Sequence, residues 1–214
     1  HDALPILFQI PSHIEYITVK PHMKRYMQAS AQIYGTLLNY ISPEDIHVYS
    51  IDEYFIDITP YTNLYKKTSR QLAQLLLDAV LDATHIYATV GIGTNLFLAK
   101  IALDILAKHA PDFIGYLDEN LFKEQIWHHQ PITDIWQVGS GIANRLRKFG
   151  AFDLHGITQV PEHKLYKEFG VNAELLIDHA WGRESCTIAD IHAYRPSKHS
   201  LSQSQILLRN YTAD

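Results

Sequence analysis

The sequence predicts an α+β fold, in which a sheet covered by helices is followed by a small all-helical unit. Two features of the chain indicate this order. Up to about residue 119, strand-like runs alternate with helical stretches. From there to about residue 184 the strand signal stops, and helical stretches are separated by short glycine turns. We therefore expect a first unit over residues 1–130, a helical unit over residues 131–195 and a linker from residue 196.

The first elements are indicated by alternation and by helical spacing. Residues 15–20 alternate and carry β-branched side chains, as strands do. Pro21 then opens a stretch in which apolar residues recur at helical spacing, until a Ser-Pro pair near residue 42 ends it. Two further strands are expected over residues 46–51 and 54–59.

The rest of the first unit shows the same signals. A helix is capped by Thr68 or Ser69 and carries an apolar stripe along one side. Residues 86–92 have the composition of a buried strand. A helix over residues 95–107 and a short strand over residues 113–117 follow.

The composition is that of an ordinary globular protein. The chain has 214 residues, of which 47% are hydrophobic and 19% are charged. No apolar run approaches the roughly 20 residues that span a bilayer, and the start lacks the regions of a signal peptide. The single cysteine, Cys186, cannot form an internal disulfide, so we expect a cytoplasmic protein. The net charge of −5 argues against nucleic-acid binding, although a local basic patch can lie on an acidic domain.

Two adjacent acids, Asp52 and Glu53, stand between two apolar strands. Strand interiors are poor in acids, and neighbouring buried carboxylates repel each other unless a cation lies between them. Mg²⁺ takes hard oxygen ligands, usually one or two carboxylates plus substrate phosphates. A pair of such ions can activate a hydroxyl and stabilise a leaving pyrophosphate. The alternative is a solvated turn that carries two acids.

A charged face is expected on the helix over residues 95–107 and just beyond it. Lys100, Asp104 and Lys108 follow one another at steps of four residues and therefore share one face. An ammonium group binds phosphate as a point charge, so Lys108 is a candidate ligand of a triphosphate. The alternative for Lys108 is a solvated side chain, which the helix dipole favours near a C-terminus.

The segment over residues 135–150 carries Gly139-Ser140-Gly141 ahead of an amphipathic helix that contains Arg145. Glycine allows a phosphate to approach the backbone, and we expect a tight hairpin with positive φ at these glycines. Free amides at the start of a helix bind anions, and Arg145 adds positive charge. Such contacts hold DNA without reading its sequence. A plain turn between two helices is the alternative.

The thirteen histidines show no spacing typical of a metal site, neither C-x-x-C nor H-E-x-x-H. The adjacent pair His128-His129 cannot easily turn both rings toward one ion on a helix. We therefore expect structural or solvated histidines.

Taken in order, these segments resemble the Y family of lesion-bypass DNA polymerases. SIDEYFID (residues 50–57) is similar to the acidic signature of that family, and TVGIGTNLFLAKIALDILAK (residues 89–108) to its strand-turn-helix segment. The hairpin over residues 135–150 resembles the family's helix-hairpin-helix. The tail KHSLSQSQIL (residues 198–207) resembles the lead-in to the family's DNA-gripping domain, in the wording of the UmuC-like UV-damage-repair branch.

The resemblance implies a palm with a mixed or antiparallel sheet and helices over residues 1–130, and a helical thumb with a helix-hairpin-helix over residues 131–195. Residues 196–214 would be a linker and the start of the little-finger domain. The implied reaction adds deoxynucleotides to a primer opposite damaged template by two-metal phosphoryl transfer. The implied roles are as follows: Asp52 and Glu53 are catalytic and bind Mg²⁺, Lys108 binds the deoxynucleoside triphosphate, and Gly139, Ser140, Gly141 and Arg145 bind primer-template DNA.

Two expected parts of the family pattern have no match in the first 20 residues: the first acidic motif, which carries a third metal carboxylate, and the fingers. We therefore expect a chain truncated at both ends and inactive by itself, with any sliding clamp contacted through missing regions. The alternative function is a non-catalytic DNA-binding module, in which the helix-hairpin-helix binds duplex and the acids are relics.

Overall fold

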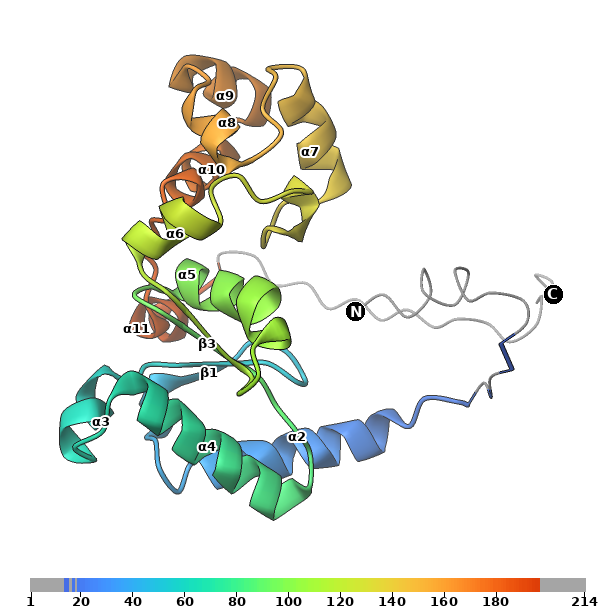
Figure 1. Ribbon diagram of the computed structural model, residues 1–214, viewed down its shortest axis with the longest axis vertical. Helices are drawn as coiled ribbons and strands as arrows, with labels where there is room; N and C mark the ends of the chain where they lie inside the picture. Colours follow the sequence, from blue (N-terminus) through green and yellow to red (C-terminus); the bar gives the residue numbers. More distant parts are fainter. Residues whose placement is uncertain (1–13, 16, 18, 197–214) are drawn as a thin grey trace.

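A computed structural model describes residues 14–196 of the chain, except Tyr16 and Thr18 (Figure 1). The first unit begins with α2 (Met23–Leu37), η1 (Pro43–Asp45), β1 (Ile46–Val48), β2 (Tyr54–Ile56), α3 (Thr59–Leu64) and α4 (Ser69–Thr84). It continues with β3 (Val90–Gly93), α5 (Leu96–Ile101), the π-helical turn η2 (Ala102–Leu106), η3 (Ala107–His109), β4 (Ile114–Leu117) and α6 (Glu119–Gln125). The remaining elements are helical: η4 (Ile132–Asp134), α7 (Ser140–Arg147), α8 (Leu154–Thr158), α9 (Glu162–Phe169), α10 (Asn172–Ala180) and α11 (Ile188–Ala193).

The predicted α+β class is confirmed, but the strands are shorter than expected. β1 pairs antiparallel with β2, and β3 pairs parallel with β4. Among the described residues these are two separate two-stranded sheets, where we expected one mixed or antiparallel sheet. Each strand has only three or four residues, and each pair is held by the helices that cover it rather than by a wider ladder.

Two strand predictions were wrong in extent. The described residues of the 15–20 stretch belong to no strand and are exposed, because alternation makes a strand only where a partner strand is present. In the 86–92 stretch, pairing begins only at Val90, opposite Ile114. The helix start at Thr68 is confirmed: its side chain accepts from the amide of Gln71, whose side chain accepts from the Thr68 amide, which is a complete capping box.

The core is divided among three apolar clusters. One lies between α2, β1, α3 and α4, and a small one between α4, β3 and β4. The largest runs from α5 through α6 into the helical unit, and includes Phe97, Leu98, Phe122, Leu146 and Leu176. Helix α5 is therefore a structural bridge, since it covers β3 on one side and packs on the helical unit on the other (Figure 1).

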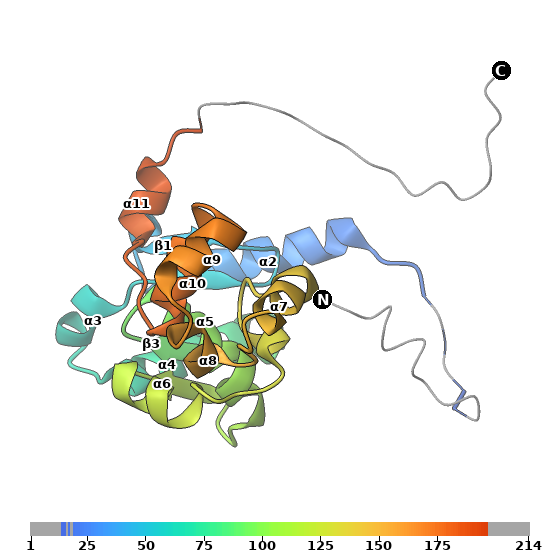
Figure 2. The same ribbon diagram turned by 90° about the horizontal axis from the view of Figure 1, so that it is seen from above.

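The helical unit is not wholly separate from the first one. Helices α7 to α10 gather at one end of the molecule, whereas α11 returns to pack against η1 and β1 (Figures 1 and 2). There the ring of His192 lies 6.1 Å from that of His47. Within the described residues, no helix is both long and apolar enough to cross a membrane.

Candidate active site

The two adjacent acids lie in the loop that joins β1 to β2. The amides of Tyr49 and Ser50 both donate to the carbonyl oxygen of Glu53, at 3.0 and 3.1 Å, which closes the loop tightly. The Ser50 hydroxyl donates to Asp52 Oδ1 at 2.8 Å. Asp52 is exposed and Glu53 is half-buried. The loop therefore holds two carboxylates that are adjacent in sequence at the turn end of a hairpin.

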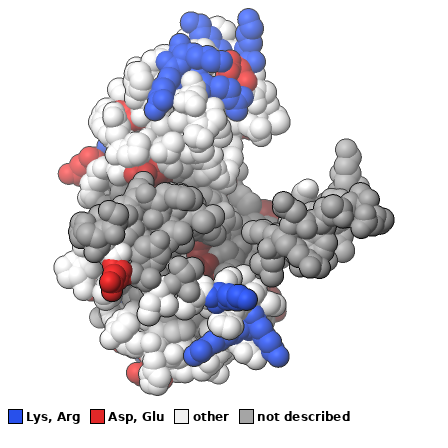
Figure 3. Space-filling model, turned by 90° about the vertical axis from the view of Figure 1, so that its right-hand side faces the viewer, with Lys and Arg blue, Asp and Glu red and all other residues white. Residues whose placement is uncertain are grey.

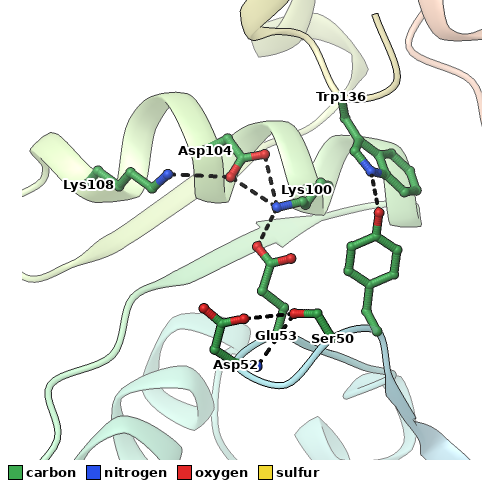
Figure 4. A network of polar contacts seen from close by, with 8 residues as sticks. Ser50, Asp52, Glu53, Lys100, Asp104, Lys108 and Trp136 are labelled. Carbon is green, nitrogen blue, oxygen red and sulfur yellow. Dashed lines mark hydrogen bonds and ion pairs between the residues drawn. The ribbon is translucent and has the colours of Figure 1, made fainter. Parts of the chain in front are cut away.

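A chain of alternating charges connects this loop to the helix that follows β3 (Figure 4). Lys100 Nζ lies 2.5 Å from Glu53 Oε1 and 3.0–3.1 Å from the two carboxylate oxygens of Asp104. Lys108 Nζ lies 3.6 Å from Asp104 Oδ1. The structure thus connects Glu53 to Lys108 through Lys100 and Asp104, although Glu53 and Lys108 are far apart in sequence. The Asp52 side chain lies in the same loop as Glu53 and is bonded to Ser50.

Lys100 is the buried centre of this network, with only 9% of its side chain exposed. Burial by itself would lower the pKa of Lys100, but the hydrogen bonds and charges of Glu53 and Asp104 outweigh burial and raise the pKa above its usual range. Lys100 is therefore a fixed positive charge that holds Glu53 in place.

Three glycines allow the helix to lie close enough to the loop for these contacts. A Cβ at Gly91 would lie 2.1 Å from the carbonyl oxygen of Ala99, and one at Gly93 would lie 2.1 Å from the Ala99 amide nitrogen. A Cβ at Gly115 would lie 2.4 Å from the carbonyl oxygen of Ala102. Backbone therefore packs directly on backbone where β3 and β4 meet α5 and η2.

The continuous helix predicted over residues 95–107 is interrupted. Its start is as expected: Asn95 caps α5 by accepting from the Leu98 amide at 2.8 Å. After Ile101 the chain forms the π-helical turn η2, which contains Asp104, and then the 3-10 turn η3, which contains Lys108. Such π-turns inside helices occur frequently at functional sites.

An aromatic contact joins the acidic loop to the helical unit. Trp136 Nε1 donates to the Tyr49 hydroxyl at 3.0 Å, and both rings also pack on Phe55. On its other side the Trp136 ring stacks near His179, at 6.0 Å, and His179 stacks on Phe97 of α5 at 4.0 Å. The loop with the acids is therefore anchored from both units.

His179 is buried and pairs with Glu184 at 3.0 Å. Burial lowers the pKa of His179 below its usual range, although Glu184 acts in the opposite direction.

The glycine hairpin differs from the expectation in one respect. Gly139 is the N-cap of α7 with φ −79°, and neither it nor Gly141 is among the glycines with positive φ, so the expected left-handed conformation was wrong. A Cβ at either position would meet no atom within 4 Å. The described part of the chain thus gives no steric reason for glycine at these two positions.

Arg145 faces inward along α9. Its guanidinium carbon lies 4.4 Å from the centre of the Phe169 ring, and Nη1 donates to the carbonyl oxygen of Glu168 at 3.3 Å. Arg147 is exposed and donates to Asn144. Figure 3 shows Lys and Arg side chains gathered at the end of the molecule formed by the helical unit, with an acidic side chain among them, and a second group of basic side chains toward the opposite end.

Lys100 and Asp104 were expected on one face with Lys108 but not in the site itself. Their spacing of four residues was the available signal, and the contact with Glu53 was not visible in it. Tyr49 and Trp136 were also missed, because nothing in the sequence indicates that positions 87 residues apart form a hydrogen bond.

Comparison with known proteins agrees with this architecture. The model of the impB/mucB/samB family (IMS) matches residues 7–104, a range that includes both acids, Lys100 and Asp104. The putative UV-damage repair protein UvrX of Bacillus subtilis is 28% identical over 207 residues, which are 96% of this chain and 48% of that protein. DNA polymerase IV 2 of the same organism is 33% identical over 162 residues, 76% of this chain and 38% of that protein.

Solved structures show the same likeness. An insertion ternary complex of Dbh DNA polymerase superposes with a TM-score of 0.66 at 28% identity, over 79% of this chain and 48% of that one. DinB from Sulfolobus solfataricus superposes with a TM-score of 0.62 at 26% identity, over 84% of this chain and 49% of that one. The chain therefore belongs to the Y family of DNA polymerases. It spans about half the length or less of the curated relatives described here.

Proposed function

We propose that the chain is the palm and thumb part of a translesion DNA polymerase that adds deoxynucleotides to a primer opposite damaged template. The observation that carries this proposal is the polar network that runs from Glu53 through Lys100 and Asp104 to Lys108. Asp52 adjoins Glu53 in the loop, so the network connects a pair of carboxylates to an exposed lysine, and a metal–triphosphate complex would need both.

Asp52 and Glu53 would hold Mg²⁺. Both offer carboxylate oxygens, the donors that Mg²⁺ prefers, and they come from a loop closed by its own hydrogen bonds. Asp52 and the network together have three carboxylates and two ammonium groups, so a cation would improve the charge balance of this region. Bound there, Mg²⁺ would stabilise the charge that develops on the transferred phosphoryl group and the leaving pyrophosphate.

The protein side chains would do the remaining work by position and charge. Lys100 holds Glu53 at a fixed place, and Tyr49 and Trp136 hold the base of the loop. Lys108, with 58% of its side chain exposed and a loose contact to Asp104, is free to turn toward the phosphates of a deoxynucleoside triphosphate.

The helical unit would be the thumb, and the hairpin before α7 would hold primer-template DNA. Gly139, Ser140 and Gly141 present the amides at the N-terminus of α7, with open space where side chains would be. Arg145 would add charge only after leaving Phe169, whereas Arg147 already lies at the surface. A DNA phosphate would fit against these glycines without displacing any part of the chain.

The same proposal includes the branch of the family, the cellular location and the activity of the 214-residue chain by itself. The match to UvrX over 96% of the chain supports assignment to the UmuC-like UV-damage-repair branch. Both relatives are bacterial, and a bacterial protein that acts on chromosomal DNA works in the cytoplasm. The 214-residue chain by itself would not extend a primer, because transition-state stabilisation needs the complete metal site.

The catalytic assignment is tested by primer extension with the protein at its full natural length. Asp52→Asn and Glu53→Gln should each reduce kcat by at least about a thousandfold, since each removes a metal ligand. Asp82→Asn, an exposed acid of α4, is the matched control and should leave kcat unchanged.

Binding of Mn²⁺ to the 214-residue chain, measured by electron paramagnetic resonance, shows whether the two acids bind metal independently of polymerase activity. Normal extension by either acid variant would overturn the catalytic assignment. If the acid variants lose Mn²⁺ binding but the full-length wild type shows no polymerase activity, the acids bind metal in a DNA-binding module that is not catalytic.

DNA binding by the hairpin is tested with Gly141→Val and Arg147→Ala. Because Gly141 has helical neighbours, open surroundings and no positive φ, valine there should not disturb the fold. We expect about fivefold weaker binding of primer-template DNA, equal for all sequences, because about 1 kcal/mol of backbone contact is lost. Arg147→Ala should lower the slope of log affinity against log salt by about one.

The measurement is fluorescence anisotropy across a salt series, with Ala31→Val, at an exposed position of α2, as the control. Unchanged affinity and slope in both test variants would mean that the hairpin is only a turn between helices.

A further inference from the structure

The end of α6 and the start of α8 bring two histidines and an aspartate together on the surface. One ligand atom from each of His128, Asp153 and His155 lies within 4.8 Å of the other two. His128 and His155 are 27 residues apart in sequence, so no short sequence motif indicates the cluster. We propose that these three residues form a binding site for a divalent transition metal ion, of which Zn²⁺ is the most suitable, outside the polymerase site.

The carboxylate of Asp153 is already oriented for this role. Its Oδ1 accepts from the amide of Gly156 at 2.6 Å and so caps α8. Its Oδ2 is directed to His128 Nδ1 at 3.1 Å. One oxygen is therefore committed to the helix and fixes the group, while the other is presented to an ion, as in metal sites whose ligands are held by a second set of hydrogen bonds.

The two histidines are held close to each other by the backbone and by aromatic packing. The His155 amide donates to the carbonyl oxygen of Trp127 at 3.0 Å, which places it beside the residue preceding His128. The His155 ring packs edge-on against Trp127 at 5.0 Å, and the two imidazole rings lie 4.8 Å apart. Only small rotations of the side chains are needed to bring the ligand atoms to a common ion.

The type of ligand selects the metal. Two imidazoles and one carboxylate suit Zn²⁺ and its transition-metal neighbours, whereas Mg²⁺ requires oxygen ligands and would stay at the acidic loop. Zn²⁺ commonly binds three protein ligands and one water molecule. The His128 side chain is 68% exposed, which leaves the outer side of the cluster open for that fourth ligand.

A bound ion would connect two parts of the fold. His128 follows α6, the last helix of the first unit, and Asp153 and His155 begin α8 in the helical unit. An ion that binds only the folded chain stabilises it by mass action, so the site would strengthen the junction between palm and thumb.

A simpler interpretation is that His128 and Asp153 form only an ion pair, and the chain contains a similar histidine–aspartate pair that serves as a control. His129 and Asp134 form a similar pair at 2.9 Å in the same region, and among the described residues no third metal-binding side chain joins them. A preference of the metal for His128 over His129 is therefore specific to the three-residue cluster.

The experiment uses the untagged 214-residue chain and a chromophoric chelator as competitor for Zn²⁺, in excess Mg²⁺ to saturate the acidic loop. The wild type should bind one tight Zn²⁺ ion. His128→Ala, His155→Gln and Asp153→Asn should each weaken binding by at least about tenfold, and His129→Ala should not. Asparagine at position 153 retains the helix cap, so its effect reports the lost carboxylate.

Visible absorption of bound Co²⁺ and thermal stability provide two independent measurements of the same site. Co²⁺ should give the visible absorption of a tetrahedral site in the wild type but not in His128→Ala. Zn²⁺ at about a hundredfold above its dissociation constant should raise the melting temperature by roughly 5–10 °C, and this gain should vanish in His128→Ala. Equal binding by wild type and His128→Ala, or equal loss in His129→Ala, would overturn the proposal.

Discussion

Replacing Lys100 with methionine tests the central contact of the polymerase site. Methionine keeps most of the aliphatic stem but removes the ammonium group that lies 2.5 Å from Glu53 and 3.0 Å from Asp104. Both carboxylates would then be left partly buried, each with 23% of its side chain exposed, and without their shared partner.

The expected loss of stability follows from these contacts. A hydrogen bond to a charged group contributes about 1.5–3 kcal/mol, and removing one partner of a buried ion pair costs about 3–5 kcal/mol. Because both carboxylates keep some contact with water, we expect about 3 kcal/mol, which is a fall in melting temperature of roughly 6–12 °C. Urea unfolding followed by circular dichroism, with a chelator present, measures this loss.

The same substitution should have the opposite effect on metal binding. In the wild type, Lys100 occupies Glu53 Oε1 and therefore competes with any divalent ion for that oxygen. The variant should bind Mn²⁺ more tightly than the wild type, and Mn²⁺ should restore part of its lost stability.

Two controls complete this test. Lys164→Met, at the position of an exposed lysine of α9, should change neither the free energy of unfolding nor the affinity for Mn²⁺. The double variant with Glu53→Gln should recover part of the stability, because the unpaired charge is then gone. A loss below about 1 kcal/mol, or Mn²⁺ affinity that falls in the single variant, would refute the view that Lys100 is the buried partner of Glu53.

Two further predictions concern the frame around the site. Gly91→Ala should destabilise the chain by at least about 3 kcal/mol, because the new Cβ would lie 2.1 Å from a backbone oxygen of α5. The control Gly35→Ala, at an open position of α2, should be neutral or stabilising. Equal melting temperatures of the two variants would disprove this reasoning. His179→Gln should weaken the acid sensitivity of folding. Since burial lowers the pKa of His179 in the folded chain, the unfolded chain binds the extra proton first, so the wild type loses stability as the pH falls below about 6.5. Denaturation at pH 7.5 and 5.5 should show a smaller loss in the variant, and equal losses would contradict this account.

Local patterns in the sequence were sufficient for much of the fold. Apolar spacing and capping residues predicted α2, α4 and the start of α5, because these depend on neighbours within a few positions. The pair Asp52-Glu53 was expected between two strands, and the structure places it in the loop between β1 and β2. The change from strands to helices near residue 119 was also visible.

Tertiary packing decided the remainder. Whether residues 15–20 formed a strand depended on a partner, and the division into two small sheets depended on the helices that cover each pair. The role of Lys100 as the partner of Glu53 required α5 to lie directly on β3, which Gly91 and Gly93 permit. The hydrogen bond from Trp136 to Tyr49 and the meeting of His128 with His155 arise from contacts between segments distant in sequence. Such contacts follow from how whole elements pack, and local periodicity carries no information about them.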